Sequence, residues 1–195
     1  MRLAACSSIL VCAACGSPSG TQPDAWTEPV QVGDCDGLVS PVVQQAGIHV
    51  PVGTPIEWPS NPPATGMHYP SWAGWNRSYN QLDRGYYVHN AEHGGIVLLY
   101  RCVEACPAVV DALTELVRSQ PIDPMCQAPI YNRMLVAYDD RLPDGVQVAA
   151  VAWGKIYTAG CVDPYLATFA AENYARAPEN FCADGIPMSG TFIAR

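Results

Sequence analysis

The chain has 195 residues, of which 49% are hydrophobic and 14% charged, and its formal net charge is −8. This composition is typical of a folded domain with a core and excludes a disordered chain. Nonspecific nucleic-acid binding depends on Lys and Arg contacts to phosphate, so an acidic chain argues against a nucleic-acid partner.

Residues 1–15 are typical of an export signal, with a basic start and an apolar run too short to cross a bilayer. The stretch VCAACGS is similar to a bacterial lipoprotein signal, in which Cys15 would be lipidated and become the N-terminus. It departs from that pattern at Cys12, where leucine is typical, and ordinary signal cleavage is the alternative. We therefore expect an exported chain in the cell envelope, periplasmic or on the outer surface, anchored in the membrane through a lipid on Cys15.

Residues 16–34 begin with a Gly-, Ser- and Pro-rich stretch and are expected to be a flexible tether, followed by a single domain over 35–195. An even number of cysteines in an exported domain predicts disulfides, but their spacing does not decide the pairing. The absence of a C-x-x-C pair disfavours a zinc–cysteine knuckle. The disulfide candidates are Cys35, Cys102, Cys106, Cys126, Cys161 and Cys182.

Residues 35–85 are rich in Pro, Gly and Trp, and we expect an ordered but irregular segment wrapped on the domain. Regular elements follow, predicted from apolar runs, helical spacing and helix-start residues. They are strand 96–101, helix 107–118, strand 133–138, strand 146–153 and a helix from Asp163-Pro164 to about residue 175. This order predicts an α+β fold: a mostly antiparallel sheet with two helices on one face and a long Pro-rich N-terminal wrap.

The stretch YYVHNAEHGGIVLLY (86–100) places two histidines four residues apart. On a strand, His89 and His93 would stand about 13 Å apart, whereas on a helical turn they would lie about 6 Å apart and could share a metal ion. Because Gly94-Gly95 prevents a long helix, sharing requires a tight turn or short helix just before strand 96–101. The inverted zinc-protease motif H-x-x-E-H needs a continuous helix, so we disfavour a metalloprotease.

Further ligands must come from other segments. His68, in the Pro-rich segment, is the best third ligand, and Glu92 is a candidate fourth ligand, partner of a ligating histidine or general base. Met67 could supply sulfur to copper, although neighbours in an extended segment point opposite ways. His49, in GIHVPVG, is interpreted as an ordinary hydrogen-bonding histidine.

Four motifs, in the same order along the chain, resemble the DUF3105 family, a domain of unknown function. They are SNPPATGMHYPSW (60–72), YYVHNAEHGGIVLLY (86–100), VAAVAWGKIY (148–157) and FAAENYARAPE (169–179). The chain departs from the family pattern at Ala64, Thr65, Met67 and Asn90-Ala91, and the six cysteines are an addition to it. The resemblance covers about residues 50–180 and implies no reaction. It does place His68, His89, Glu92 and His93 in one motif set, while Glu179 in the terminal A-P-E is expected to be an anchor.

The leading hypothesis is an extracytoplasmic, membrane-tethered protein that binds or handles one copper or zinc ion; Met67 favours copper and Glu92 favours zinc. A metalloenzyme using the same site is an alternative. Another is a redox module, because Cys102-x3-Cys106 between a strand and a helix is similar in outline to thioredoxin-like copper chaperones. The last is a disulfide-stapled envelope interaction domain without metal. The sequence leaves substrate, protein partner and oligomeric state open.

Overall fold

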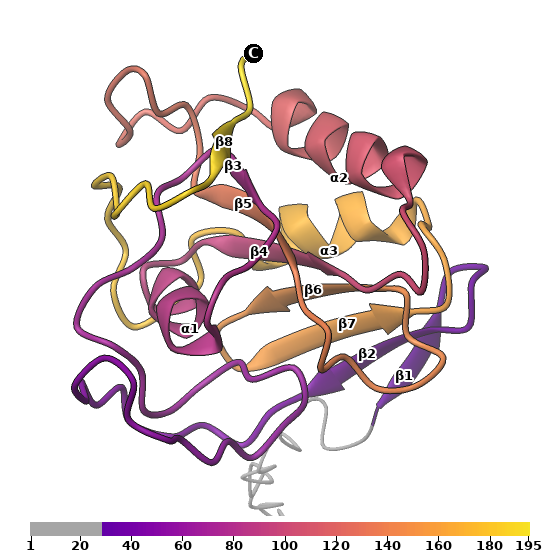
Figure 1. Ribbon diagram of the computed structural model, residues 1–195, viewed down its shortest axis with the longest axis horizontal. Coiled ribbons are helices and arrows are strands. Elements are labelled where there is room, and N and C mark those ends of the chain that lie inside the picture. The colour runs from indigo at the N-terminus through magenta and orange to yellow at the C-terminus, as the bar shows by residue number, and fades with distance from the viewer. Residues whose placement is uncertain (1–28) are drawn as a thin grey trace, which may run out of the picture.

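Eight strands form one mixed sheet in the computed structural model, which describes residues 29–195 (Figure 1). Cys15 and most of the expected tether therefore lie outside the described residues. The strands are β1 (Val30–Val32), β2 (Gly37–Pro41), β3 (Arg77–Tyr79), β4 (Ile96–Tyr100), β5 (Met134–Tyr138), β6 (Val148–Ala152), β7 (Lys155–Ala159) and β8 (Thr191–Phe192). The helices are α1 (Arg84–Glu92), α2 (Pro107–Ser119) and α3 (Tyr165–Asn173).

The strand order is β1-β2-β7-β6-β4-β5-β3-β8. Only β5 pairs in parallel, with β4 on one side and β3 on the other, and all other neighbours are antiparallel. The predicted α+β class with a mostly antiparallel sheet is confirmed. The prediction missed the short strands β1, β2, β3, β7 and β8, because strands of a few residues carry little periodicity. One of them, β1, falls inside the range expected to be a tether.

The central strands divide the core into two layers because successive side chains point to opposite faces. In β4, Ile96, Leu98 and Tyr100 pack with α2 and α3, as expected for two helices on one face. On the other face, Val97 and Leu99 pack with α1 and with Trp75 from the Pro-rich segment. Figure 1 shows α1 on that side, next to the indigo and magenta wrap of residues 40–75.

Local chemistry sets where α1 begins and ends. The side chain of Asp83 caps it by accepting the Gly85 amide, which is a typical N-cap arrangement. Gly94 follows with φ +80°, a left-handed conformation that favours glycine, and so ends the helix. The backbone then enters β4 at once. Asp83 and Gly94 therefore fix both ends of α1, and its last turn lies directly before β4.

Three disulfides join the six cysteines of the described chain: Cys35–Cys161, Cys102–Cys106 and Cys126–Cys182. Two of them join distant segments, with sequence separations of 126 and 56, whereas Cys102 and Cys106 are 4 apart. None of the helices within residues 29–195 is long and apolar enough to cross a membrane.

Candidate metal centre

The site lies at the C-terminal end of α1, where His89 and Glu92 occupy the last turn and His93 is the C-cap. The expected short helix before β4 is thus present. The C-terminal end of a helix carries partial negative charge from its aligned peptide dipoles, which favours a cation nearby. The H-x-x-E-H motif occupies the last turn of α1 and its C-cap, and the helix ends there, as the Gly94-Gly95 pair predicted.

A backbone carbonyl fixes the tautomer of two buried imidazoles, those of His68 and His89. Nδ1 of His89 lies 2.6 Å from the Tyr69 carbonyl oxygen, and Nδ1 of His68 lies 2.8 Å from the Gly66 carbonyl oxygen. A carbonyl only accepts, so each Nδ1 carries the proton, and Nε2 of each neutral ring presents a lone pair. This is the arrangement by which proteins orient metal-ligating histidines.

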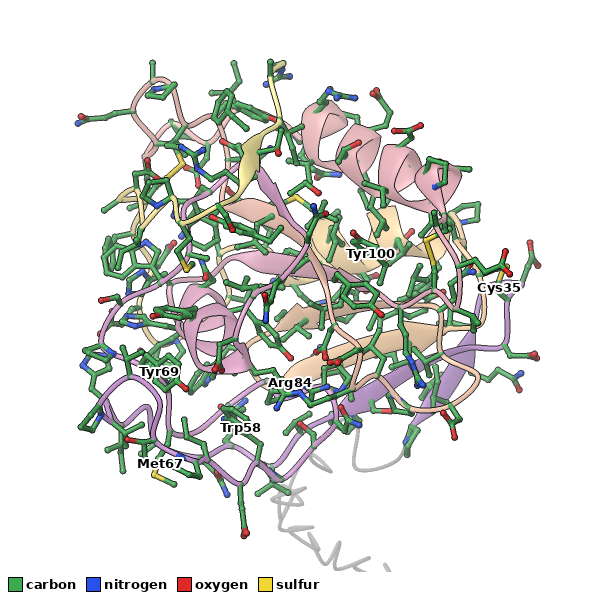
Figure 2. The ribbon with its side chains drawn as sticks, in the orientation of Figure 1. Cys35, Trp58, Met67, Tyr69, Arg84 and Tyr100 are labelled. Carbon is green, nitrogen blue, oxygen red and sulfur yellow. A yellow bond between two sulfur atoms is a disulfide. The ribbon has the colours of Figure 1, made fainter. Side chains whose placement is uncertain are left out.

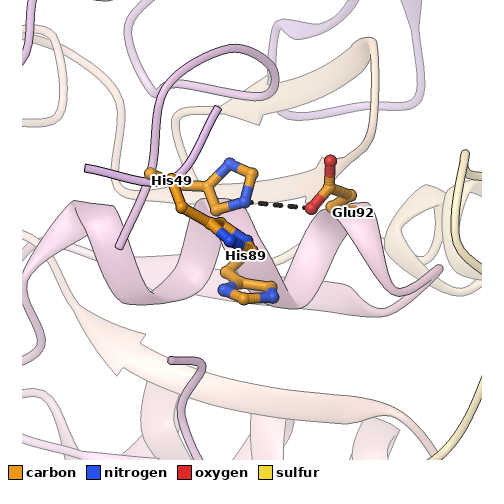
Figure 3. Close-up of side chains that lie close together, drawn as sticks. His49, His89 and Glu92 are labelled. Atoms are coloured by element: carbon orange, nitrogen blue, oxygen red, sulfur yellow. Dashed lines mark ion pairs between the residues drawn. The ribbon is translucent and has the colours of Figure 1, made fainter. Parts of the chain in front are cut away.

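The carboxylate of Glu92 faces Nε2 of His68, the ring nitrogen that the Gly66 carbonyl does not engage. Oε2 of Glu92 lies 2.9 Å from Nε2 of His68, the ion pair drawn as a dashed line in Figure 3. In the neutral ring both atoms are acceptors, and no hydrogen bond of good geometry reaches that buried nitrogen. The pair therefore needs either a shared proton or a cation.

The fourth member of the cluster is His49, which enters from the Pro-rich segment. It forms an isolated parallel bridge with His68, so the two backbones run side by side. Its ring centroid lies 4.8 Å from that of His89 and 4.9 Å from that of His68. Figure 3 shows His49, His89 and Glu92 gathered beside α1.

One ligand atom from each of His49, His68, His89 and Glu92 lies within 4.8 Å of all the others. Three of these residues are buried and His49 is exposed, so the cluster is closed toward the core and reached from solvent past one ring. Gly47 packs directly against this group: a Cβ there would lie 1.6 Å from Oε1 of Glu92.

His93 adjoins the cluster but lies outside the group of four. Its Nε2 is 3.0 Å from Nε2 of His89 and 3.1 Å from Oε2 of Glu179, while its Nδ1 is buried without a partner. The rings of Trp72 and Phe181 pack on it at centroid distances of 4.3 Å and 4.0 Å. These two half-buried aromatic rings cover His93.

Burial keeps the histidines of α1 neutral. Burial lowers the pKa of His89 to about 4, although the hydrogen bond to the Tyr69 carbonyl opposes the change. Burial and the facing His89 ring lower the pKa of His93 to about 3. Burial raises the pKa of Glu92, but the hydrogen bond and charge of His68 outweigh it, so that pKa is lowered overall. At neutral pH Glu92 is ionised and His89 neutral, the forms that bind metals.

The residues predicted from sequence as ligands separate into two groups. His68, His89 and Glu92 come together as expected, and His93 adjoins them. Met67 is 38% exposed and lies on the outside of the Pro-rich segment, next to the fully buried His68 (Figure 2). Its carbonyl accepts a hydrogen bond from Nε1 of Trp58.

Sequence reasoning missed His49 and undervalued Glu179. His49 lies 19 positions before His68 in an irregular segment, and only the backbone bridge between them brings the rings together. Glu179 was expected to be an anchor. Its amide does donate to the Glu92 carbonyl, and its side chain also reaches His93.

The comparisons with known proteins gave one family. A model described as "Protein of unknown function (DUF3105)" matches residues 49–184, a range that begins at His49 and includes every residue of the cluster. No curated protein and no solved structure matched the chain.

Proposed function

Since the chain belongs to the DUF3105 family, whose function is unknown, its role must be inferred from the site, and we propose that it binds one zinc ion through His49, His68, His89 and Glu92. The observation that carries this is the group of four ligand atoms within 4.8 Å of one another. Three imidazole nitrogens and one carboxylate oxygen form a set that suits tetrahedral zinc.

The donor set favours zinc over copper. The copper hypothesis gained from the thioether of Met67, but that residue is 38% exposed on the outer side of the segment, whereas the buried ligands are nitrogen and oxygen atoms. Soft sulfur ligands select copper(I), and mixed imidazole and carboxylate ligands suit zinc. Four protein ligands also saturate a tetrahedral ion, so we propose binding or handling of the metal as the role.

The test is metal content after purification without chelator. We expect about one zinc per chain, and we expect His68→Ala and His89→Ala each to lower retention at least about tenfold. Met67→Ala is the matched control and should retain zinc fully. Full retention in both histidine variants would refute the site, and would leave the disulfide-stapled interaction domain as the better account. Loss in Met67→Ala would favour copper with a sulfur ligand.

A second candidate is a metal-dependent hydrolase that uses the same ion. It is favoured by the exposure of His49, which could leave one coordination position to water, and by the His93–Glu179 pair beside the cluster. Cobalt(II) substitution separates the two roles. A saturated site keeps its tetrahedral absorption spectrum when azide is added, whereas an open position binds the anion and the spectrum changes.

We also propose that the chain is exported and anchored by a lipid on Cys15. The signal-like residues 1–15 and three disulfides support this, since disulfides persist in oxidising compartments. The test is detergent-phase partitioning of the full chain expressed in a bacterium. Wild type should enter the detergent phase and Cys15→Ala should not. Equal partitioning of both proteins would exclude the lipid anchor.

A further inference from the structure

A second reactive group lies at the opposite end of β4 from the metal cluster. Cys102 follows the end of β4 by two residues, and Cys106 is the N-cap residue of α2. Their disulfide therefore spans the short connection between a buried strand and a helix. The connecting residues 103–105 are exposed, with Val103 fully so. The bond itself is partly accessible, because both cysteines are only half-buried.

This disulfide constrains little that the fold does not already fix. Tyr100 is held in the central strand by pairing with β5 and β6, and Pro107 begins a helix that packs on the same core. The other two disulfides join segments 126 and 56 residues apart, so they restrict the unfolded chain far more than a separation of 4 does. A structural role explains those two better than it explains Cys102–Cys106.

Cavities flank the disulfide on both sides. One of about 440 Å³ lies between Cys102, Cys106 and the loop of residues 144–147. The other, of about 500 Å³, lies between the same cysteines and the side chains of Tyr100 and Tyr138. Arg101 holds the facing loop in place, since its side chain bonds the Leu142 carbonyl and Asp144. The two cavities together leave room for a peptide to reach the sulfur atoms.

The helix start provides a place for a thiolate. No side-chain oxygen caps α2, and Cys106 stands where an N-cap side chain accepts an amide hydrogen from the first turn. Helix N-termini lower the pKa of cysteine thiols and stabilise the thiolate. When a thiolate reduces this disulfide, Cys106 is therefore the better leaving group of the two cysteines.

From these observations we propose that Cys102–Cys106 is a redox-active disulfide that exchanges with a peptide dithiol, independently of the metal site. The partner thiolate attacks Sγ of Cys102, the S–S bond breaks, and Cys106 leaves as the thiolate at the start of α2. The second thiol of the partner, once deprotonated, then attacks the partner sulfur that is bonded to Cys102. This releases Cys102, which takes up a proton. The chain gains two electrons, and the partner dithiol is oxidised to a disulfide.

The first experiment uses the wild-type chain in metal-free glutathione buffers of increasing reducing strength, followed by acid quenching, alkylation and peptide mass spectrometry. Cys35–Cys161 and Cys126–Cys182 are internal controls. We expect Cys102–Cys106 to be half reduced at a glutathione ratio at which both controls remain at least about 95% oxidised. Reduction of all three disulfides over the same range would overturn the proposal.

The second experiment measures the thiolate and the exchange reaction. In Cys102→Ser, the absorbance of Cys106 at 240 nm should titrate with a pKa of about 7 or lower, against about 8.5 for a free thiol. A synthetic peptide with two cysteines should be oxidised by one equivalent of wild type, and not by the double variant C102S/C106S. The double variant should keep the wild-type circular dichroism and zinc content. An ordinary thiol pKa, or peptide oxidation by the double variant, would refute the assignment.

Discussion

At the scale of single residues, the metal cluster depends on one position without a side chain. Gly47 lies against Glu92, and a Cβ there would lie 1.6 Å from Oε1 and 3.2 Å from Cε1 of His68. Because Oε1 is the far end of a flexible side chain, the fold can tolerate an alanine there by moving the carboxylate. The fold and the site therefore respond differently to the same substitution.

We predict that Gly47→Ala lowers zinc affinity at least about tenfold, because it displaces a ligand carboxylate, while the free energy of unfolding of the metal-free protein changes by less than about 1 kcal/mol. Competition with a chromophoric chelator measures the affinity. Gly160→Ala is the matched control, since a Cβ there meets only backbone oxygens at 3.5 Å. An unchanged affinity in Gly47→Ala would remove Glu92 from the ligand set.

At the scale of elements, a buried ion pair ties the end of α1 to β5. Arg133, just before β5, bonds Asp123 at 2.8 Å and also donates to the His93 carbonyl at 2.9 Å. Burial raises the pKa of Asp123, but hydrogen bonds from the Met125 amide and the Tyr174 hydroxyl, together with Arg133, outweigh it and lower that pKa overall. The carboxylate therefore supports the helix terminus that carries the cluster.

A carboxyl whose pKa is depressed in the folded state contributes stability above its unfolded pKa of about 4, and this contribution is lost as pH falls through the lower folded pKa. We predict that Asp123→Asn destabilises the protein by about 3 kcal/mol at pH 7, since it leaves a buried guanidinium without its charge partner. The difference from wild type should shrink below about pH 4. Urea unfolding of wild type and variant at pH 7 and below about pH 4 measures this difference in the free energy of unfolding.

Asp140→Asn is the control for that experiment, because Asp140 is exposed and has the same formal charge. It should change the free energy of unfolding by less than about 0.5 kcal/mol at either pH. If Asp123→Asn behaves like Asp140→Asn, the ion pair does not stabilise the junction between α1 and β5.

At the scale of the whole molecule, the Cys126–Cys182 disulfide ties the C-terminal segment to the loop between α2 and β5. Phe181, beside it, packs on His93, and Glu179 reaches the same ring. With a sequence separation of 56, this disulfide is expected to contribute about 4 kcal/mol, against about 2 kcal/mol for Cys102–Cys106 with a separation of 4.

We therefore predict that the double variant C126A/C182A lowers the free energy of unfolding about twice as much as C102A/C106A does. Denaturant unfolding under non-reducing conditions compares them. The first variant should also bind zinc more weakly, because the segment with Glu179 and Phe181 is less constrained. Equal destabilisation by both variants would contradict the loop-closure argument.

Metal binding should also stabilise the whole fold, because the four ligands come from segments that separate on unfolding. We predict that zinc at about 100 times its dissociation constant raises the free energy of unfolding by about 2.7 kcal/mol, and that a chelator reverses this. Thermal unfolding with and without zinc measures the effect. At the same zinc concentration His68→Ala should gain at most about 1.4 kcal/mol, and a gain as large as that of wild type would place the binding elsewhere.

The sequence alone determined what depends on neighbouring residues. Apolar runs and helical spacing predicted β4, α2, β5, β6 and α3, and the spacing of His89, Glu92 and His93 predicted a helical turn, since positions three and four apart share a helix face. Tertiary structure alone decided what depends on distant residues. These contacts are the Cys35–Cys161 and Cys126–Cys182 disulfides, the backbone bridge that places His49 beside His68, and the ion pair of Glu179 with His93. Such contacts join residues whose separation leaves no local periodicity in the chain, so the packing of the complete domain fixes them.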